Sequence, residues 1–341
     1  MAELFGQEYT PEEIRARVGT MKQVAGWRRG MYTEGKEDGL RFLEMNNGVL
    51  DATILESRCL DLSSLHYRGI PLQFSGCNGW VHPAFADAMQ QPLHSVNGGM
   101  FYTCGLTNVG KKYEEDDFHG QARLIPAEQV IARAEWKDGS YCLEAEGTMR
   151  QNGVLCENLS LKRRYSSAMG SSVISVKDTV TNEGFLPAPF MMMYHVVFGY
   201  PLLDKNTQVY LPEAAEEACF HAAEPTPDGR DSKGWLHKTH ADAEGRSHYG
   251  IYNPDLELGV AVSFNGKNMP YISQWKSMKS GDYAMGLMPS TCAAGGRQKE
   301  IDNGTLQYLQ PGESKDFELT FTVFEGEKGL ELLKKKIESC K

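Results

Sequence analysis

Along most of the chain apolar and polar residues alternate with a period of two, the pattern of strands that have one buried face. The clearest case is the segment KDFELTFTVFEG, whose apolar positions are Phe317, Leu319, Phe321 and Val323. Ile174, Val176 and Val180 follow the same rule and end at the turn-like sequence Asn-Glu-Gly at 182–184. Further runs of this kind recur at short intervals, with turn residues between them. The pattern predicts a chain built mainly from β-strands.

Two helices are predicted, one near each end. Thr10, Pro11 and Glu13 combine an N-cap, a proline at the first helical position and a capping box. Residues 329–340 place Leu330, Leu333 and Ile337 on one helical face. We therefore expect a single domain over residues 1–341, with an N-terminal helical extension (about 1–30) and a C-terminal helix (about 328–341).

The strand runs do not alternate with helices, which argues against a doubly wound parallel sheet. Asn152-Gly153, between two strand-like runs, is a strong short-range hairpin signal. The polar segment 213–245 reads as a long excursion from the sheets. The expected fold is all-β, with short peripheral helices: a large antiparallel β-sandwich. By analogy, a broad twisted sheet of this kind often holds carbohydrate on a concave face.

Charge and composition narrow the set of partners. The 341 residues include 45 acidic and 35 basic side chains, for a formal charge of −10. This balance disfavours nucleic acid and anionic membranes as partners. No apolar stretch approaches the ~20 residues of a membrane span, and the N-terminus does not resemble a secretory signal. We expect a cytoplasmic protein whose eight cysteines, none in a CxxC pair, are reduced thiols and not metal ligands.

The chain has no phosphate-binding loop, nucleophile elbow or HExxH motif, so its histidines carry the candidate chemistry. His195 follows three methionines and a tyrosine and precedes Val-Val-Phe, so we expect its imidazole to be desolvated and neutral. His119 is followed by Gly120, which permits close approach of a backbone or ligand, and by Arg123. A core or turn role is the alternative for each. Two imidazoles and an arginine suit proton transfer at a ring oxygen or carbonyl.

Aromatic side chains are candidate platforms for the apolar face of a sugar ring. Trp275, flanked by Gln274 and Lys276, is the favoured one. The other candidates are Trp80, Tyr102, Phe198 and Tyr200. Four histidines in or beside the polar excursion are expected to be solvated: His221, His237, His240 and His248.

Seven segments spread along the chain resemble the aldose 1-epimerase-like proteins of the galactose mutarotase superfamily, within a bacterial branch of that family. They are RVGTMKQVAGWRRG, ESRCLDLSSLHYRGIPLQF, GWVHPAF, GGMFYTCGLTNVG, FHGQARLIPAE, MYHVVFGYPLL and GLMPSTCAAGGR. The resemblance covers nearly the whole chain and implies a large β-sandwich with the sugar on a concave face. That agrees with the strand pattern.

The resemblance also implies site residues. His119 and His195 match the two histidines that contact the sugar, one of which protonates the ring oxygen, and Arg123 matches the arginine of an HGFAR variant. Gln274, Trp275 and Arg297 are predicted to bind substrate from their local sequence. The branch motifs add further residues that line the pocket: His82, Asn108 and Arg58.

Met288 stands where relatives carry a glutamate that removes the anomeric proton. A thioether cannot accept that proton, so Met288 is predicted to contact substrate and not to act as the base. The nearest carboxylates by sequence that could replace the glutamate are Asp282, Glu300 and Asp204.

The predicted function is therefore an isomerase of the aldose 1-epimerase (mutarotase) type, which acts by acid/base chemistry at the anomeric centre of a free sugar without a cofactor. One alternative is a different sugar epimerase, isomerase or lyase on the same scaffold, with a divalent metal held by His82, His119 and His195. The other is a sugar-binding protein without catalysis.

Overall fold

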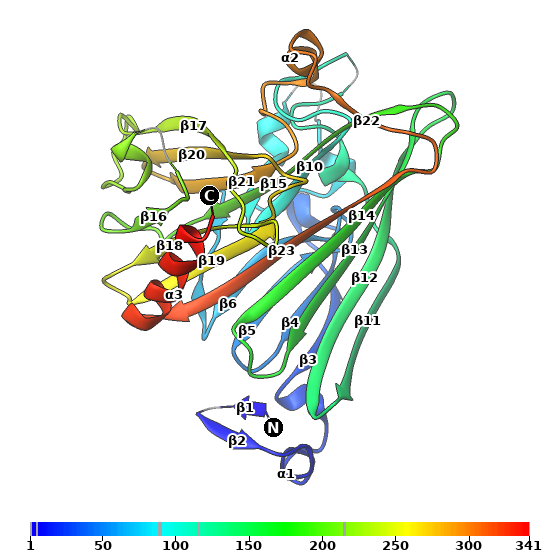
Figure 1. Cartoon of the computed structure of the whole chain (residues 1–341). Coiled ribbons are helices and arrows are strands. Elements are labelled where there is room, and N and C mark those ends of the chain that lie inside the picture. The colour runs from blue at the N-terminus through cyan, green and yellow to red at the C-terminus, as the bar shows by residue number, and fades with distance from the viewer. Residues whose placement is uncertain (1, 5, 88–90, 115, 214–215, 341) are drawn as a thin grey trace.

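The computed structural model describes the chain except for residues 1, 5, 88–90, 115, 214–215 and 341. Its named strands all pair antiparallel, and most belong to three large sheets (Figure 1). This confirms the predicted all-β class, in which the described helices are few and short.

The largest sheet has eight strands and forms the broad wall seen in Figure 1. In spatial order its strands are β11 (Glu128–Lys137), β12 (Ser140–Asn152), β13 (Asn158–Ala168), β14 (Val173–Asn182), β23 (Ser314–Glu325), β19 (Leu258–Asn265), β18 (Arg246–Asn253) and β16 (Gln208–Tyr210).

The six-stranded sheet carries the candidate site. Its order is β10 (Phe101–Leu106), β15 (Ala188–Phe198), β21 (Asp282–Ser290), β20 (Tyr271–Lys279) and β17 (Lys233–Lys238), with β22 (Gln307–Leu309) paired to the start of β15. The five-stranded sheet consists of β3 (Gly26–Met31), β4 (Arg41–Asn46), β5 (Leu50–Leu55), β6 (Asp61–Tyr67) and β7 (Ile70–Pro71). Two small hairpins pair β1 (Ala2–Leu4) with β2 (Gln7–Tyr9) and β8 (Phe74–Ser75) with β9 (Gly98–Gly99).

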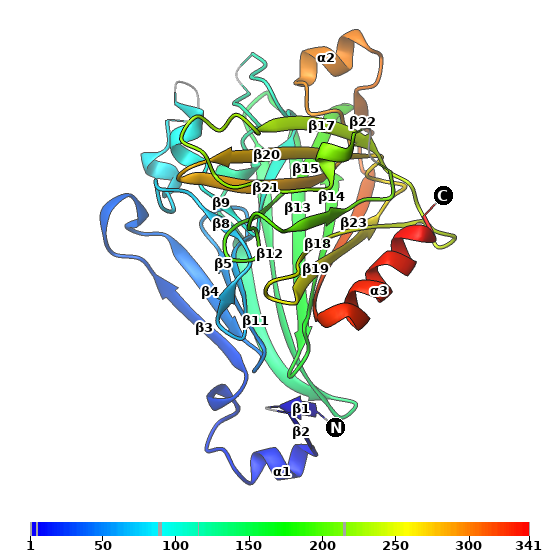
Figure 2. The ribbon, with the colours of Figure 1, turned by 90° about the vertical axis from the view of Figure 1, so that its left-hand side faces the viewer.

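The described helices lie at the periphery (Figure 2). The α-helices are α1 (Pro11–Arg15), α2 (Arg297–Asp302) and α3 (Gly326–Glu338). The 3₁₀ turns are η1 (Met21–Gln23), η2 (Gly35–Glu37), η3 (Pro83–Phe85), η4 (Pro92–Ser95), η5 (Ala122–Leu124) and η6 (Glu217–Cys219). Among the described residues, no helix has the length and apolar character needed to cross a bilayer.

One continuous apolar core joins the three large sheets. The alternating positions of β23 supply Phe317, Leu319 and Phe321, all buried. Phe321 stacks on Phe101 of β10 with ring centroids 6.1 Å apart, which ties the eight-stranded sheet to the six-stranded one. The period of two therefore buries one face of each sheet against the others.

Several local expectations differ from the structure. The N-terminal 30 residues are only partly helical: α1 has the predicted capping box at Thr10 and Glu13, but β1, β2 and β3 also lie in this region. The Asn152-Gly153 hairpin exists, but its strands are joined by residues 153–157 and not by a two-residue turn. The polar excursion contains β17, which pairs with β20. His237 and His248, expected to be solvated, are each 5% exposed.

Candidate functional site

A pocket of about 620 Å³ lies on one face of the six-stranded sheet. Its floor comes from β10, β15, β20 and β21, and its roof comes from the segment between β8 and β10 together with Lys36. The floor residues are Tyr102, His195, Val197, Trp275, Ser277, Lys279 and Asp282. The roof residues are Lys36, Phe74, Gly76, Cys77, Asn78, Leu93, His94, Val96 and Gly98.

The strand register gathers candidate residues into one row across the six-stranded sheet, and Tyr102 and His195 of this row line the pocket. Tyr102 is the partner of His195, and Met288 is the partner of Ser273. The β15–β21 pairs on either side, at 193 with 290 and 197 with 286, set His195 opposite Met288. Side chains paired in this way point to the same face of a sheet. Four adjacent strands thus present Tyr102, His195, Met288 and Ser273 side by side.

His195 is a buried, neutral imidazole. Its ring stacks on Tyr102 with centroids 4.3 Å apart and an interplanar angle of 16°. Burial disfavours the charged form and lowers the pKa of His195 to about 3. The side chain is 8% exposed, and within the described structure its Nδ1 atom has no hydrogen-bond partner. A buried polar atom without a partner in a pocket wall is suited to a ligand hydroxyl.

His119 meets His195 edge to face, with ring centroids 5.4 Å apart. The Gly110 N–H donates to His119 Nδ1 at 3.1 Å, so a neutral imidazole carries its proton on Nε2. Burial, followed by the proximity of His195 and Arg123, holds the pKa of His119 well below its usual value. His119 is therefore set up as a neutral hydrogen-bond donor through Nε2.

The loop that holds His119 depends on Gly120. Gly120 has φ +73°, and a Cβ there would lie 2.4 Å from the Gly105 carbonyl oxygen and 2.5 Å from that of Asn108. His119 itself has φ +64°, an uncommon conformation for a residue other than glycine. The predicted close approach at Gly120 is thus made by the protein's own backbone.

Three predicted pocket residues act as buried anchors of the loops. Arg123 is fully buried, pairs with Asp117 and donates to the Phe118 and Gly120 carbonyls. The Asn108 amide donates to the Lys111 and Asp117 carbonyls, and its oxygen accepts from the Arg297 N–H.

Arg58 holds the roof of the pocket. Its guanidinium donates to the carbonyls of Val81 at 3.2 Å, Ser95 at 2.9 Å and Arg123 at 3.3 Å. It is 3% exposed, and burial lowers its pKa to about 10. Arg58, like Arg123 and Asn108, shapes the site without lining the pocket of about 620 Å³.

The other predicted binding residues separate into those at the pocket and those away from it. Trp275 lines the pocket and is 40% exposed. Its neighbour Gln274 points to the opposite face, where it is 2% exposed and hydrogen-bonded to His237. Arg297 pairs with Asp116 at 2.8 Å beside a different hollow. His82 caps η3, accepting from the Ala84 N–H.

Met288 is 5% exposed and belongs to an apolar cluster with Tyr102. Of the three carboxylates suggested as substitutes for the glutamate base, Asp282 lines the pocket but pairs with Lys279 at 2.8 Å. Glu300 accepts hydrogen bonds from Ala293 and Thr305, and Asp204 accepts from the Lys205 N–H. Neither Glu300 nor Asp204 lines this pocket.

The alternative metal site is not assembled. Among the described residues, no three or more His, Cys, Asp or Glu side chains are placed together to hold a metal ion. His82, His119 and His195 therefore do not form the metal site of the alternative hypothesis. The structure brings together His119 and His195 only.

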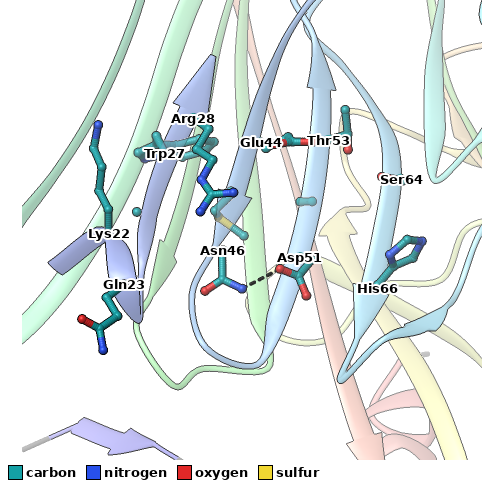
Figure 3. Close-up of a pocket in the computed structure, with 13 residues that line it drawn as sticks. Lys22, Gln23, Trp27, Arg28, Glu44, Asn46, Asp51, Thr53, Ser64 and His66 are labelled. Atoms are coloured by element: carbon teal, nitrogen blue, oxygen red, sulfur yellow. Dashed lines mark hydrogen bonds between the residues drawn. The ribbon is translucent and has the colours of Figure 1, made fainter. Parts of the chain in front are cut away.

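A second hollow, of about 400 Å³, lies on the five-stranded sheet (Figure 3). Its polar side chains come from two rows across β3, β4, β5 and β6 and from Lys22 and Gln23 of η1. In one row Asn46 donates to Asp51 at 2.5 Å. None of its lining residues carries a buried polar atom without a partner. This hollow is therefore a solvated face of the sheet, and the pocket that His195 lines is the stronger candidate site.

Sequence reasoning missed the roof of the pocket and the far end of its floor. Lys36, Asn78 and Leu93 come from turns and short bridging segments, and Lys279 ends a strand. No motif marks these positions. The alternation along β20 was the one available signal, because it places Lys279 on the same face as Trp275.

This fold is that of the galactose mutarotase-like proteins. A candidate aldose 1-epimerase from Klebsiella pneumoniae aligns with a TM-score of 0.85 and 20% identity, over 94% of this chain and 90% of its own. A galactose mutarotase-like protein from Clostridium acetobutylicum aligns with a TM-score of 0.62 and 13% identity, over 89% of this chain and 99% of its own. At these identities the similarity shows the fold and confirms the resemblance seen in the sequence.

The chain belongs to the family described as Domain of unknown function (DUF4432), which matches residues 37–323. No curated protein matches the sequence significantly. A candidate mutarotase from Salmonella typhimurium shares the fold more distantly, with a TM-score of 0.55 and 10% identity over 88% of this chain and 94% of its own.

Proposed function

We propose that the protein is a mutarotase-type isomerase that interconverts the anomers of a reducing sugar, with His119 and His195 as its catalytic residues. The observation that carries the proposal is the contact between two neutral imidazoles: His195 lines the pocket, and His119 behind it has a fixed Nε2–H donor. The galactose mutarotase-like fold supports sugar-related activity at this face.

The proposed reaction moves one proton between two oxygens of the sugar and restores the enzyme. His195 accepts the proton of the anomeric hydroxyl, which becomes the aldehyde carbonyl as the bond from the ring oxygen to the anomeric carbon breaks. The ring oxygen takes that proton from His195 while it accepts a hydrogen bond from His119 Nε2–H, so both imidazoles end neutral. After rotation about the adjacent carbon–carbon bond, the ring closes on the other face of the carbonyl by the reverse transfer.

The site differs from the pattern implied by the resemblance because Met288 occupies the position expected for the glutamate base. Its place opposite His195 puts a thioether in the row where the anomeric proton would be removed. In our proposal His195 takes over that role. Burial lowers the basicity of His195, so we expect a slower enzyme than one with a carboxylate in the row.

The test is anomer exchange measured by NMR for a panel of reducing sugars at pH 7. The proposal expects a rate above buffer for at least one sugar, and loss of that rate in both His119→Gln and His195→Gln. Binding of a sugar without acceleration of its exchange would overturn the proposal and favour a non-catalytic sugar-binding protein.

A further inference from the structure

The pocket extends along β20 well beyond the row that contains His195. Ser273, Trp275, Ser277 and Lys279 share one face of this strand, and the last three line the pocket. The intervening side chains point the other way: Gln274 Nε2 donates to the Cys219 carbonyl at 2.8 Å. Figure 2 shows β20 and β21 lying side by side across the sheet.

The strand geometry sets the length of this floor. Ser273 pairs with Met288 in the His195 row, and Lys279 lies six residues further along. At the usual rise per residue of a strand, the two Cα positions are about 20 Å apart. One pyranose ring at the histidines covers only a fraction of that length, even when the lysine side chain folds back toward it.

The two ends of the floor are polar, and its middle is mainly apolar, with Trp275 and Val197 beside the hydroxyl of Ser277. One end has His195, whose Nδ1 lacks a partner among the described residues. The other end has the ion pair of Lys279 with Asp282 at 2.8 Å, which offers both donors and acceptors to hydroxyl groups. Trp275 lies between them, 40% exposed, where it offers an aromatic face. Two polar ends separated by an aromatic surface match two linked sugar rings better than one.

We infer, resting on the proposed function, that the substrate is a reducing saccharide of at least two units. Its reducing unit lies at His119 and His195. Its second unit lies over Trp275 and extends toward Lys279 and Asp282.

The experiment compares each hexose with a reducing disaccharide that ends in it: glucose with maltose and cellobiose, using NMR anomer exchange and calorimetric titration. We expect at least one disaccharide to exceed glucose in kcat/KM, or in affinity, by about tenfold, the effect of one added hydrogen bond to a charged group. In Lys279→Ala the ratio of disaccharide to glucose kcat/KM should fall about tenfold, through KM.

Lys334→Ala is the matched control, because Lys334 pairs with Glu331 three residues away on α3, as Lys279 pairs with Asp282 on the sheet. It should leave the ratio unchanged. Equal kcat/KM for the two sugar lengths, or an unchanged ratio in Lys279→Ala, would overturn the inference while the proposed function stands. If no sugar is turned over, the proposed function fails, and the affinity ratio from calorimetry decides the length of the ligand.

Discussion

Strands β10 and β15 carry polar side chains on both faces, but the hydrogen bonding of these side chains differs between the two faces. On the core side, Thr103 and Tyr194 join a network with Asp61, Arg163 and Asp178. Tyr194 donates to Asp178 at 2.7 Å, and the Arg163 guanidinium donates to Asp61 at 2.8 Å and to Asp178 at 2.6 Å. We call these five residues the core-face network. None of its described polar side-chain atoms is left buried without a partner.

On the pocket side, one residue along each strand, Tyr102 and His195 stack on each other, and His119 contacts His195. Here the Nδ1 atom of His195 is buried without a partner in the described structure. A charged group can stay buried on the core side because its partners are present, whereas the pocket-side imidazoles are kept neutral. The state of hydrogen bonding therefore separates a polar cluster that holds the fold from one that is open to a ligand.

The largest expected effect is on the core side. Arg163→Met leaves Asp61 and Asp178 buried without their cation, and should lower the free energy of unfolding by about 3–5 kcal/mol. Urea denaturation measures this loss. His195→Gln is the pocket-side control and should cost less than about 1 kcal/mol, since the Nδ1 atom of His195 has no hydrogen-bond partner in the described structure. A loss of similar size in both variants would erase the distinction between the two faces.

On the pocket side the effect should appear in rate. His119→Gln removes the fixed Nε2–H donor to the ring oxygen and should slow anomer exchange by about 10²–10³-fold, or about 3–4 kcal/mol of barrier. NMR exchange measures the rate, and circular dichroism checks that the fold is kept. His248→Gln, at a buried histidine bonded to Ser263 on the eight-stranded sheet, should leave the rate unchanged. Equal slowing in both variants would contradict the assignment of His119.

Met288→Glu should increase the rate. A carboxylate opposite His195 supplies the base that the row lacks, and a positioned base is worth about 10²–10⁴-fold when its geometry is right. We expect a gain of at least about tenfold because the pocket is otherwise complete. Met288→Gln matches the glutamate in size without its charge and should show no gain. If Met288→Glu exchanges anomers no faster than Met288→Gln, proton transfer does not take place at the row of residues that contains His195 and Met288.

Gln274 and Trp275 are adjacent on β20 and point to opposite faces of the sheet, so they provide a further test. Trp275→Ala should weaken sugar binding by about three- to tenfold, the usual worth of an aromatic contact, with little change in stability. Gln274→Ala should leave affinity unchanged and lower the free energy of unfolding by about 1–2 kcal/mol, because His237 and the Cys219 carbonyl lose their partner. Calorimetry measures the affinity, and urea denaturation measures the stability. If Gln274→Ala weakened sugar binding and Trp275→Ala did not, the pocket would lie on the opposite face of β20.

The smallest effect is a pH dependence of stability. The pKa of His195 falls from 6.5 to about 3 on folding, so the unfolded chain binds the extra proton between those values. The stability from the neutral imidazole is complete above pH 6.5 and is lost as the pH falls toward 3. Relative to His195→Gln, the wild-type protein should therefore lose about 1 kcal/mol between pH 7 and about pH 5.5. Parallel stability curves for the two proteins would contradict the lowered pKa.

The sequence was enough to predict the fold because alternation is strong in strands such as β14 and β23, where every second residue is buried. It did not predict β17, whose residues lie in a polar segment and gain their strand conformation by pairing with β20. The resemblance pointed to His119 and His195, and the structure brings those two rings together.

The roles of the other candidates depended on contacts that a sequence does not show. Arg58 donates to backbone carbonyls of distant segments, and Asn108 and Arg123 donate to carbonyls of their own loop, so a motif residue can shape a pocket without lining it. Alternation along β20 implied that Gln274 and Trp275 face opposite sides, but only the packing of the sheets decides which side is buried.

The most direct test of the central claim, that the pocket-side imidazoles contact a sugar, is an NMR titration of the histidine ring signals with a reducing saccharide. We expect His119 in the Nε2–H form and neutral at pH 7, with the signals of His119 and His195 shifting together on addition of the sugar. The signals of His237 and His248, bonded to Gln274 and Ser263, should stay in place. If a sugar binds and the signals of His119 and His195 do not shift, the two imidazoles do not contact it and the proposed site is wrong.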